Sequence, residues 1–113
     1  MAARALESKG MRVVERNWRR PEGELDVIAF DTDGTCVFCE VRSRTGESTG
    51  DPLETIDARK QARVIRAARL YLSLAEPPIA ATAFRFDVVA VTFFPDGSEP
   101  RLVYVPAAFE SNG

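Results

Sequence analysis

Residues 23–43 read GELDVIAFDTDGTCVFCEVRS, and the architecture of the whole chain can be worked out from this segment. Two runs rich in β-branched and aromatic residues, Glu24 to Phe30 and Thr35 to Ser43, lie on either side of Asp31-Thr32-Asp33-Gly34. A short polar loop with Asp and Gly between two such runs is typical of a β-hairpin. The segment therefore predicts two antiparallel strands whose turn is centred between Thr32 and Asp33.

The residues before this hairpin predict a short helix and one further strand. Residues 2–6 have the apolar spacing of a helix, and Gly10 stands where helices commonly stop in a left-handed conformation. Met11 to Trp18 has an extended pattern and is followed by the turn-forming Pro21-Glu22-Gly23. The first three predicted strands are thus consecutive, as in a β-meander.

The residues after the hairpin predict a second helix. Arg44 to Asp51 contains glycine and hydroxyl residues without periodicity and is expected to be a loop. Asp51 is expected to cap a helix that begins at Pro52 and ends near Ala75, because Pro77-Pro78 cannot continue it. The side chains expected to pack on the sheet are Ile65, Ala68, Leu72 and Ala75.

The last part of the chain predicts two more strands. Phe84 to Phe94 is apolar on both faces apart from Arg85 and Asp87, which is typical of a central strand. Arg85 and Asp87 share a face, so a structural ion pair is expected first and support for a functional site second. Arg101 to Val105 is the expected hairpin partner. The order α-β-β-β-α-β-β over 113 residues predicts one α/β domain, residues 1–113, with a mixed sheet flanked by helices.

Composition narrows the classes of function. A formal net charge of -2, from 15 basic and 17 acidic residues, excludes a protein that binds its partners through bulk positive charge alone. The absence of histidine excludes Ser-His nucleophiles and histidine-ligated metals. No apolar run is long enough for a signal peptide or a membrane helix, so we expect no membrane partner and a cytoplasmic location.

Cys36 and Cys39 are expected to be buried structural thiols. They are three residues apart on a predicted strand, which sends their side chains to opposite faces, and no second cysteine pair completes a zinc site.

Asp26 and Glu40 are the candidate catalytic pair. The predicted turn places Asp26 near residues 39–41, and residues two apart on a strand share a face, so Glu24 accompanies Asp26 and Arg42 accompanies Glu40. Two carboxylates that meet repel each other unless a cation neutralises them, and Mg²⁺ needs only oxygen ligands. The alternative is a pair of surface carboxylates on an edge hairpin, which the apolar neighbours of both residues disfavour.

Five segments in this order resemble the uncharacterised bacterial YraN family, and they cover nearly the whole chain. They are Arg16-Asn17-Trp18-Arg19, Gly23 to Ala29, Val37 to Arg44, Lys60, and Arg85 to Val89. The resemblance implies a restriction-endonuclease-like fold of the PD-(D/E)xK nuclease superfamily, similar to that of archaeal Holliday-junction resolvases. It also implies metal-dependent hydrolysis of phosphodiester bonds in structured or branched DNA.

By position, the resemblance implies that Asp26 and Glu40 hold Mg²⁺ or Mn²⁺, with the Val41 carbonyl as a third ligand. For Glu24 two roles are open: assisting the site, or accepting a hydrogen bond at the turn. Arg42 stands where the family usually has lysine; it offers permanent charge and a fork for phosphate, but no neutral amine to act as a base. The family usually has a helix glutamate upstream of Ala2-Ala3, a position that Met1 follows here. Glu7 is a poor substitute, since eight helical residues span about 12 Å.

Basic residues after the hairpin are the candidate nucleic-acid contacts, namely Arg44, Arg59, Lys60 and Arg63. A solvated helix face would explain most of them equally well. Lys60 matches a family position and is expected to approach the site from the helix, where it would partly replace the missing lysine.

The expected function is a Mg²⁺- or Mn²⁺-dependent endonuclease of structured DNA, for which a homodimer would supply the two sites needed to cut both strands of a junction. One alternative is a catalytically impaired nucleic-acid-binding module of the same fold, favoured by Arg42 and by the missing upstream glutamate. The other is a protein-interaction adaptor without a nucleic-acid role.

Overall fold

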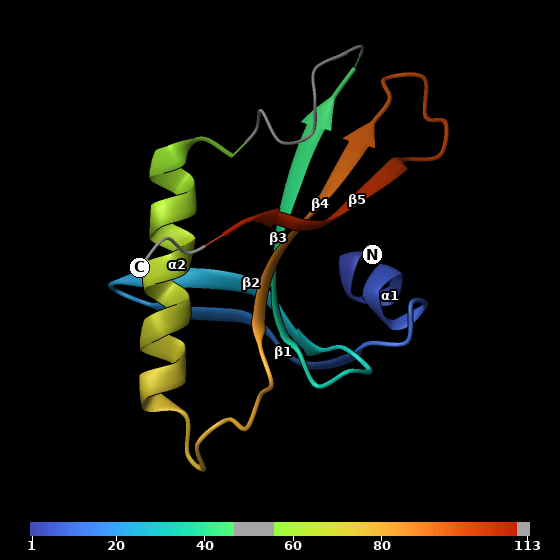
Figure 1. The fold of residues 1–113 in the computed structure, drawn as a ribbon. Helices are drawn as coiled ribbons and strands as arrows, with labels where there is room; N and C mark the ends of the chain where they lie inside the picture. The colour runs from blue at the N-terminus through green and yellow to red at the C-terminus, as the bar shows by residue number, and fades with distance from the viewer. Residues whose placement is uncertain (47–55, 111–113) are drawn as a thin grey trace.

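A computed structural model describes residues 1–46 and 56–110 of the chain (Figure 1). The described elements are α1 (Ala2–Glu7), β1 (Arg12–Arg20), β2 (Gly23–Phe30), β3 (Cys36–Thr45), α2 (Ala58–Leu74), β4 (Phe84–Phe93) and β5 (Arg101–Phe109). The predicted order α-β-β-β-α-β-β is confirmed. Within these described ranges, no helix is long and apolar enough to cross a lipid bilayer.

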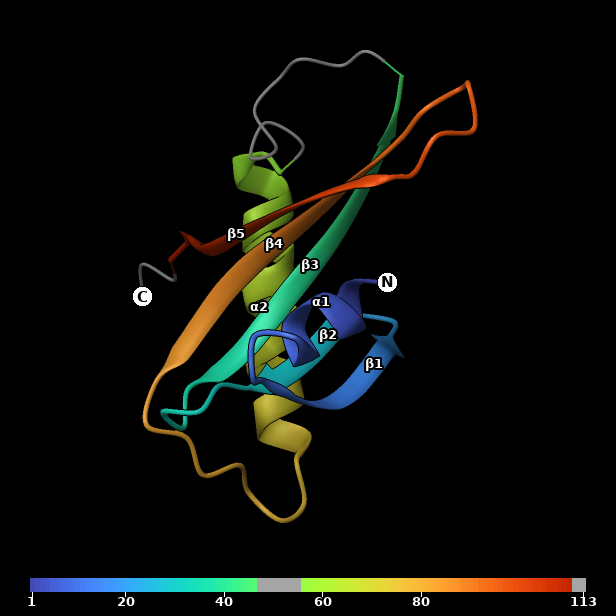
Figure 2. The ribbon, with the colours of Figure 1, turned by 90° about the vertical axis from the view of Figure 1, so that its right-hand side faces the viewer.

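The five strands form one mixed sheet in the order β1-β2-β3-β4-β5. Neighbouring strands are antiparallel except for β3 and β4, which are parallel and are connected through α2. Figure 2 shows α1 in front of the sheet and α2 behind it, so the two helices cover opposite faces. This is the expected restriction-endonuclease-like arrangement of a mixed sheet flanked by helices.

The predicted hairpin of β2 and β3 is confirmed, but its pairing is centred on Asp33 and not between Thr32 and Asp33, so each β2 residue faces a partner one position further along β3. Its pairs include Val27 with Cys39 and Ile28 with Phe38, and Gly34 in the turn has a φ of 88°, which glycine adopts without strain. Continuing this antiparallel register by one residue brings Asp26 opposite Glu40. The hydrogen bond between the Asp26 side chain and the Val41 N–H confirms the prediction that Asp26 lies near residues 39–41.

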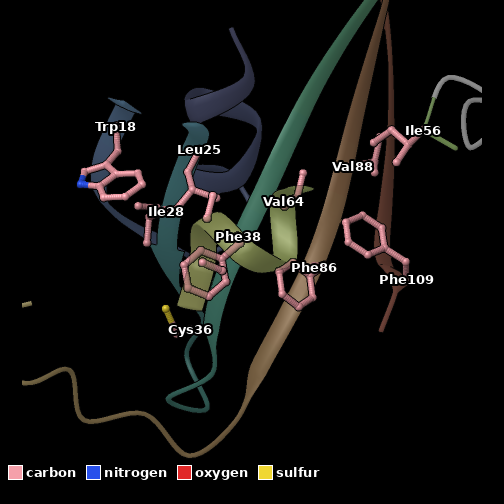
Figure 3. Close-up of a cluster of buried hydrophobic side chains, with 12 residues drawn as sticks. Trp18, Leu25, Ile28, Cys36, Phe38, Ile56, Val64, Phe86, Val88 and Phe109 are labelled. Carbon is pink, nitrogen blue, oxygen red and sulfur yellow. The ribbon is translucent and has the colours of Figure 1, made fainter. Parts of the chain in front are cut away.

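Two apolar clusters pack on the two faces of the sheet. The cluster beneath α2 is centred on Phe38, whose ring stacks on Phe86 at 5.6 Å between centroids (Figure 3). The cluster beneath α1 contains Leu6, which is fully buried. Because Cys36 belongs to the first cluster and Cys39 to the second, the predicted opposite orientation of the two thiols is confirmed. Burial raises the pKa of both thiols, that of Cys36 to about 11, as expected for structural cysteines.

The second helix differs from its prediction at its start. It begins at Ala58, where the carboxylate of Asp57 accepts the backbone N–H of Lys60 at 2.8 Å; the expected cap at Asp51 and start at Pro52 lie outside the described residues. Its buried side chains are Val64, Ala67 and Ala68, whereas Ile65 and Leu72 are only partly buried and Ala75 follows the helix. The packing face is therefore rotated by about one residue from the predicted one. Its end before Pro77-Pro78 is confirmed.

The loop predicted from Arg44 to Asp51 is also partly wrong, because Arg44 and Thr45 extend β3. Their parallel pairing with Thr92 and Phe93 of β4 continues the ladder, which local composition does not reveal. Residues 47–51 of that prediction lie outside the described part of the chain.

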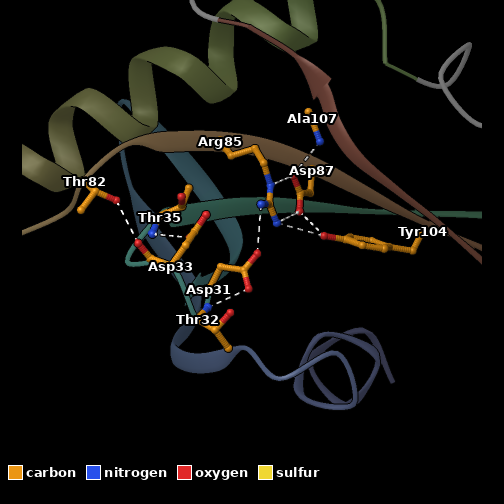
Figure 4. Close-up of polar contacts among 9 residues, drawn as sticks. All are labelled: Asp31, Thr32, Asp33, Thr35, Thr82, Arg85, Asp87, Tyr104 and Ala107. Carbon is orange, nitrogen blue, oxygen red and sulfur yellow. Dashed lines mark hydrogen bonds and ion pairs between the residues drawn. The ribbon is translucent and has the colours of Figure 1, made fainter.

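Arg85 and Asp87 form the predicted structural ion pair (Figure 4). The fully buried carboxylate of Asp87 accepts Nε and Nη2 of Arg85 at 2.9 and 3.0 Å, the backbone N–H of Ala107 at 2.9 Å, and the Tyr104 hydroxyl. Arg85 also contacts Asp31 at 3.0 Å. The network therefore ties β4 to β5 and to the turn of the β2–β3 hairpin.

Candidate active site

Asp26 and Glu40 come together where the hydrogen-bonded ladder between β2 and β3 ends. Beyond the pair of Val27 and Cys39, the Oδ2 atom of Asp26 accepts the backbone N–H of Val41 at 2.8 Å. A carboxylate thus takes the place of a backbone carbonyl in the ladder, which holds the Asp26 side chain against the peptide that follows Glu40. The two acidic residues are positioned by the sheet and not by a loop.

The Glu40 carboxylate is buried beside a second negative charge. Its side chain is 3% exposed, and burial is the main reason why its pKa rises from 4.5 to about 7. The charge of Asp26 raises this pKa further, whereas Lys60 and Arg42 lower it. A buried carboxylate with a strongly perturbed pKa and a carboxylate neighbour is characteristic of functional sites.

Lys60 reaches this site from the first turn of α2. Its Nζ atom lies 3.2 Å from Oε1 of Glu40, and its side chain is 24% exposed. The sequence prediction that Lys60 approaches the site from the helix is therefore confirmed in geometry. A lysine amine accordingly lies next to the glutamate although Arg42 occupies the lysine position of the sequence motif.

Gly23 allows α2 to pack closely on the start of β2. A Cβ atom added at Gly23 would lie 3.0 Å from the Cβ of Ala67, which is tighter than ordinary van der Waals contact. A larger residue here would push the helix away from the strand. The close packing at this point thus contributes to the position of Lys60 relative to Glu40.

Arg42 and Glu24, the other two predicted catalytic residues, are placed differently relative to Asp26 and Glu40. Arg42 is half-buried on β3, and its charge acts on Glu40. Glu24 is exposed and forms an ion pair with Arg19 at 3.5 Å. The Glu24 carboxylate thus lies at the surface in an ion pair with Arg19, and not in the buried site around Glu40.

The predicted nucleic-acid contacts divide into two groups. Arg44 lies further along β3, and its Nε donates to the Thr92 hydroxyl at 3.0 Å. Arg59 and Arg63 are exposed on α2. Arg63 lines a hollow of about 400 Å³ between α2 and the β1–β2 turn, which we call the α2 groove. Its lining includes Arg20, Gly23, Glu24, Lys60, Arg63 and Arg66.

A second hollow, of about 270 Å³, contains two residues to which the sequence analysis gave no role. This β1 hollow is lined by Asp26 and Val41 together with Ala3, Arg16 and Asn17. Asn17 has a φ of 53°, a left-handed conformation that asparagine tolerates better than most residues. Arg16-Asn17 is part of the motif that resembles the YraN family, but no pattern in the sequence indicates that β1 turns its residues toward Asp26.

The donor set fits a divalent cation with an incomplete protein coordination shell. Asp26 and Glu40 offer adjacent carboxylates, which Mg²⁺ and Mn²⁺ prefer. In residues 1–46 and 56–110 there is no group of three or more His, Cys, Asp or Glu side chains that could hold a metal. Mg²⁺ is commonly bound by one or two carboxylates, with water and substrate phosphate supplying the remaining ligands, and this site suits that mode.

Comparison with known proteins gives a consistent match. Residues 1–91 match the model of "Uncharacterised protein family UPF0102". A UPF0102 protein of Stutzerimonas stutzeri is 43% identical over 111 residues, which cover 98% of this chain and 89% of the relative. A UPF0102 protein of Anaeromyxobacter dehalogenans is 44% identical over 113 residues, covering 100% of this chain and 81% of the relative.

Proposed function

The chain belongs to the uncharacterised protein family UPF0102, which is the YraN family that the five sequence segments predicted, and we propose that it is a metal-dependent endonuclease of structured or branched DNA. One observation carries this proposal. Asp26 and Glu40 lie on neighbouring strands; Asp26 is held by the Val41 N–H, and Nζ of Lys60 lies 3.2 Å from Oε1 of the buried Glu40. Paired carboxylates with a nearby cation are suited to phosphodiester hydrolysis with Mg²⁺ or Mn²⁺.

Each residue of the site has a separate role in this proposal. Asp26 and Glu40 hold the cation, with the Val41 carbonyl as a further ligand, and a bound cation would act as a Lewis acid on a phosphate oxygen. The hydrogen bond from the Val41 N–H fixes the Asp26 carboxylate before any ligand arrives. Preorganised ligands of this kind avoid the reorganisation that would otherwise accompany binding.

In this proposal, Lys60 and Arg42 together perform the functions of the single lysine in the PD-(D/E)xK motif. Lys60 can orient the attacking water and hold its proton, because a lysine amine changes protonation state far more readily than a guanidinium. Arg42 carries permanent charge and can stabilise the negative charge that develops on the phosphate. Lys60 is on the helix, so this division requires α2 to stay in place on β2.

Cleavage assays with purified protein test the proposal directly. In Mn²⁺, the protein should cut four-way junctions, flaps or single strands, and Asp26→Asn or Glu40→Gln should remove this activity. Glu99→Gln removes a carboxylate from an exposed loop residue and serves as the matched control. Absence of cleavage, or equal cleavage by wild type and Asp26→Asn, would rule out the nuclease.

A second candidate is a module of the same fold that binds nucleic acid without cutting it, and Arg42 in the lysine position favours it. Calorimetric titration with Mn²⁺ distinguishes the two candidates. The nuclease should give a heat of binding that Glu40→Gln abolishes, whereas the module should bind DNA in a salt-sensitive way without a metal requirement.

The proposal includes a homodimer, since cutting both strands of a junction requires two sites. Sedimentation with and without a junction would measure it. A nuclease that stays monomeric on the junction would cut one strand per binding event.

A further inference from the structure

The two hollows described above lie on either side of the candidate site. The β1 hollow is lined by Asp26 and the α2 groove by Lys60. Lys60 contacts Glu40, and the charges of Glu40 and Asp26 act on each other. Asp26 of the β1 hollow and Lys60 of the α2 groove thus both act on the buried Glu40, so the two hollows border one site.

Basic side chains line both hollows. In the α2 groove, Arg63 and Arg66 are exposed on α2, and Arg20 faces them from β1 while its guanidinium lies 4.9 Å from the Trp18 ring centroid. In the β1 hollow, Arg16 is exposed. Exposed arginines of this kind can form bidentate contacts with phosphate groups.

The acidic residues of the groove do not cancel this charge. Glu24 is engaged by Arg19, which itself does not line the groove, and Glu22 is exposed in the turn. The groove thus keeps a surplus of cationic side chains next to the carboxylate pair. Basic side chains around a pair of carboxylates allow a polyanion such as DNA to approach the two negative charges.

Asn17 lines the β1 hollow beside Asp26. Arg16 pairs with Val27 and Trp18 with Leu25, so Asn17 lies opposite Asp26 in the register of β1 and β2. Continuing the register of β2 and β3 by one residue beyond Val27 and Cys39 brings Glu40 next to Asp26, which extends the row of Asn17 and Asp26 to three polar residues. The left-handed backbone of Asn17 interrupts regular strand geometry in this row, and such conformations are frequent at ligand-binding sites.

We propose that the two hollows form one track for the sugar–phosphate backbone of a single DNA strand. Arg16 and Asn17 hold a phosphate on one side of the Asp26–Glu40 pair, and Arg63 and Arg66 hold phosphates on the other. This proposal rests on the proposed function, because it places the bond to be cut at the carboxylate pair between the two ends. It makes an unpaired strand, as found in flaps and at junction centres, the feature that the protein recognises.

Fluorescence anisotropy with a labelled single strand of mixed sequence, in EDTA so that no strand is cut, tests both ends of the track. Arg16→Glu should weaken binding roughly tenfold, and Arg63→Glu combined with Arg66→Glu should weaken it more. The dependence of affinity on salt should fall by about one counterion for each phosphate that the variant no longer neutralises. Arg101→Glu makes the same charge change on the exposed start of β5 and should alter affinity no more than about twofold.

Asn17→Gly gives a second variant at the β1 hollow, because glycine keeps the left-handed backbone and removes only the amide side chain. It should weaken binding a few-fold without a change in the folded state. Wild-type affinity in both Asn17→Gly and Arg16→Glu would overturn the β1 end, and with it the track.

Parallel assays separate failure of the track from failure of the nuclease. Cleavage of a junction in Mn²⁺ combined with unchanged binding by either set of arginine variants overturns the track and leaves the nuclease intact. Loss of DNA binding in both sets of arginine variants, without any cleavage by the wild type, supports the track and overturns the proposed nuclease activity. No binding by the wild type at low salt overturns the track.

Discussion

Replacing Glu40 with Gln should make the metal-free protein more stable at alkaline pH and leave its stability nearly unchanged in acid. In the folded protein the pKa of Glu40 is about 7, above its ordinary value of 4.5, so the native state binds a proton that the unfolded chain has released. Stability from this proton is fully present below pH 4.5 and is lost as the pH rises through about 7. Above that range the wild type contains a buried carboxylate that destabilises it.

The size of the effect follows from the separation of the two pKa values. Moving a pKa from 4.5 to about 7 corresponds to a free-energy difference of about 3 kcal/mol. For a domain of 113 residues this difference is equivalent to about 10 °C in melting temperature. Glutamine has the same shape as glutamate and no charge, so Glu40→Gln should not lose this stability as the pH rises.

Thermal and urea unfolding of both proteins in EDTA, from pH 4.5 to pH 8.5, would measure the difference. Glu99→Gln, which changes an exposed carboxylate, should stay within about 0.5 kcal/mol of the wild type throughout. Parallel pH curves for wild type and Glu40→Gln would refute the reasoning. Added Mn²⁺ at about one thousand times its Kd should reverse the order, because it stabilises the wild type by about 4.1 kcal/mol and has no complete site in the variant.

Three further changes test the surroundings of the site. Lys60→Met should reduce Mn²⁺-dependent cleavage at least about a hundredfold in single-turnover assays. Lys60→Arg keeps the ion pair with Glu40 but removes the base. Full activity in Lys60→Met would contradict the proposed role of Lys60. Gly23→Ala should cost about 1–3 kcal/mol in urea unfolding, and a second change, Ala67→Gly, should restore most of it; a neutral Gly23→Ala would show that the contact is not tight. Asp87→Asn should cost about 3 kcal/mol, because Arg85 loses its buried partner, and a loss below about 1 kcal/mol would argue against the network as a structural element.

The hairpin and the positions of its acidic residues were predictable because their causes are local. A polar loop between two apolar runs specifies the turn to within about one residue, so Asp26 could be placed near residues 39–41 from the sequence, whereas the pairing centred on Asp33 is set by the structure. The start of α2 was less accessible, since several residues before Ala58 can cap a helix equally well on local grounds. Its packing face also depends on the twist of the sheet beneath it, and the prediction was wrong by about one residue.

Local sequence was therefore enough to specify the order of elements, the β2–β3 hairpin and the proximity of Asp26 to residues 39–41, because each depends on neighbours within a turn or a strand. Long-range packing determined which other residues lie beside the carboxylates of Asp26 and Glu40. Lys60 lies beside Glu40 since α2 packs closely on Gly23, and Asn17 lies opposite Asp26 since β1 pairs with β2 in one particular register. The burial that perturbs the pKa of Glu40 exists only when strands and helix have assembled, and no short segment of the chain contains it.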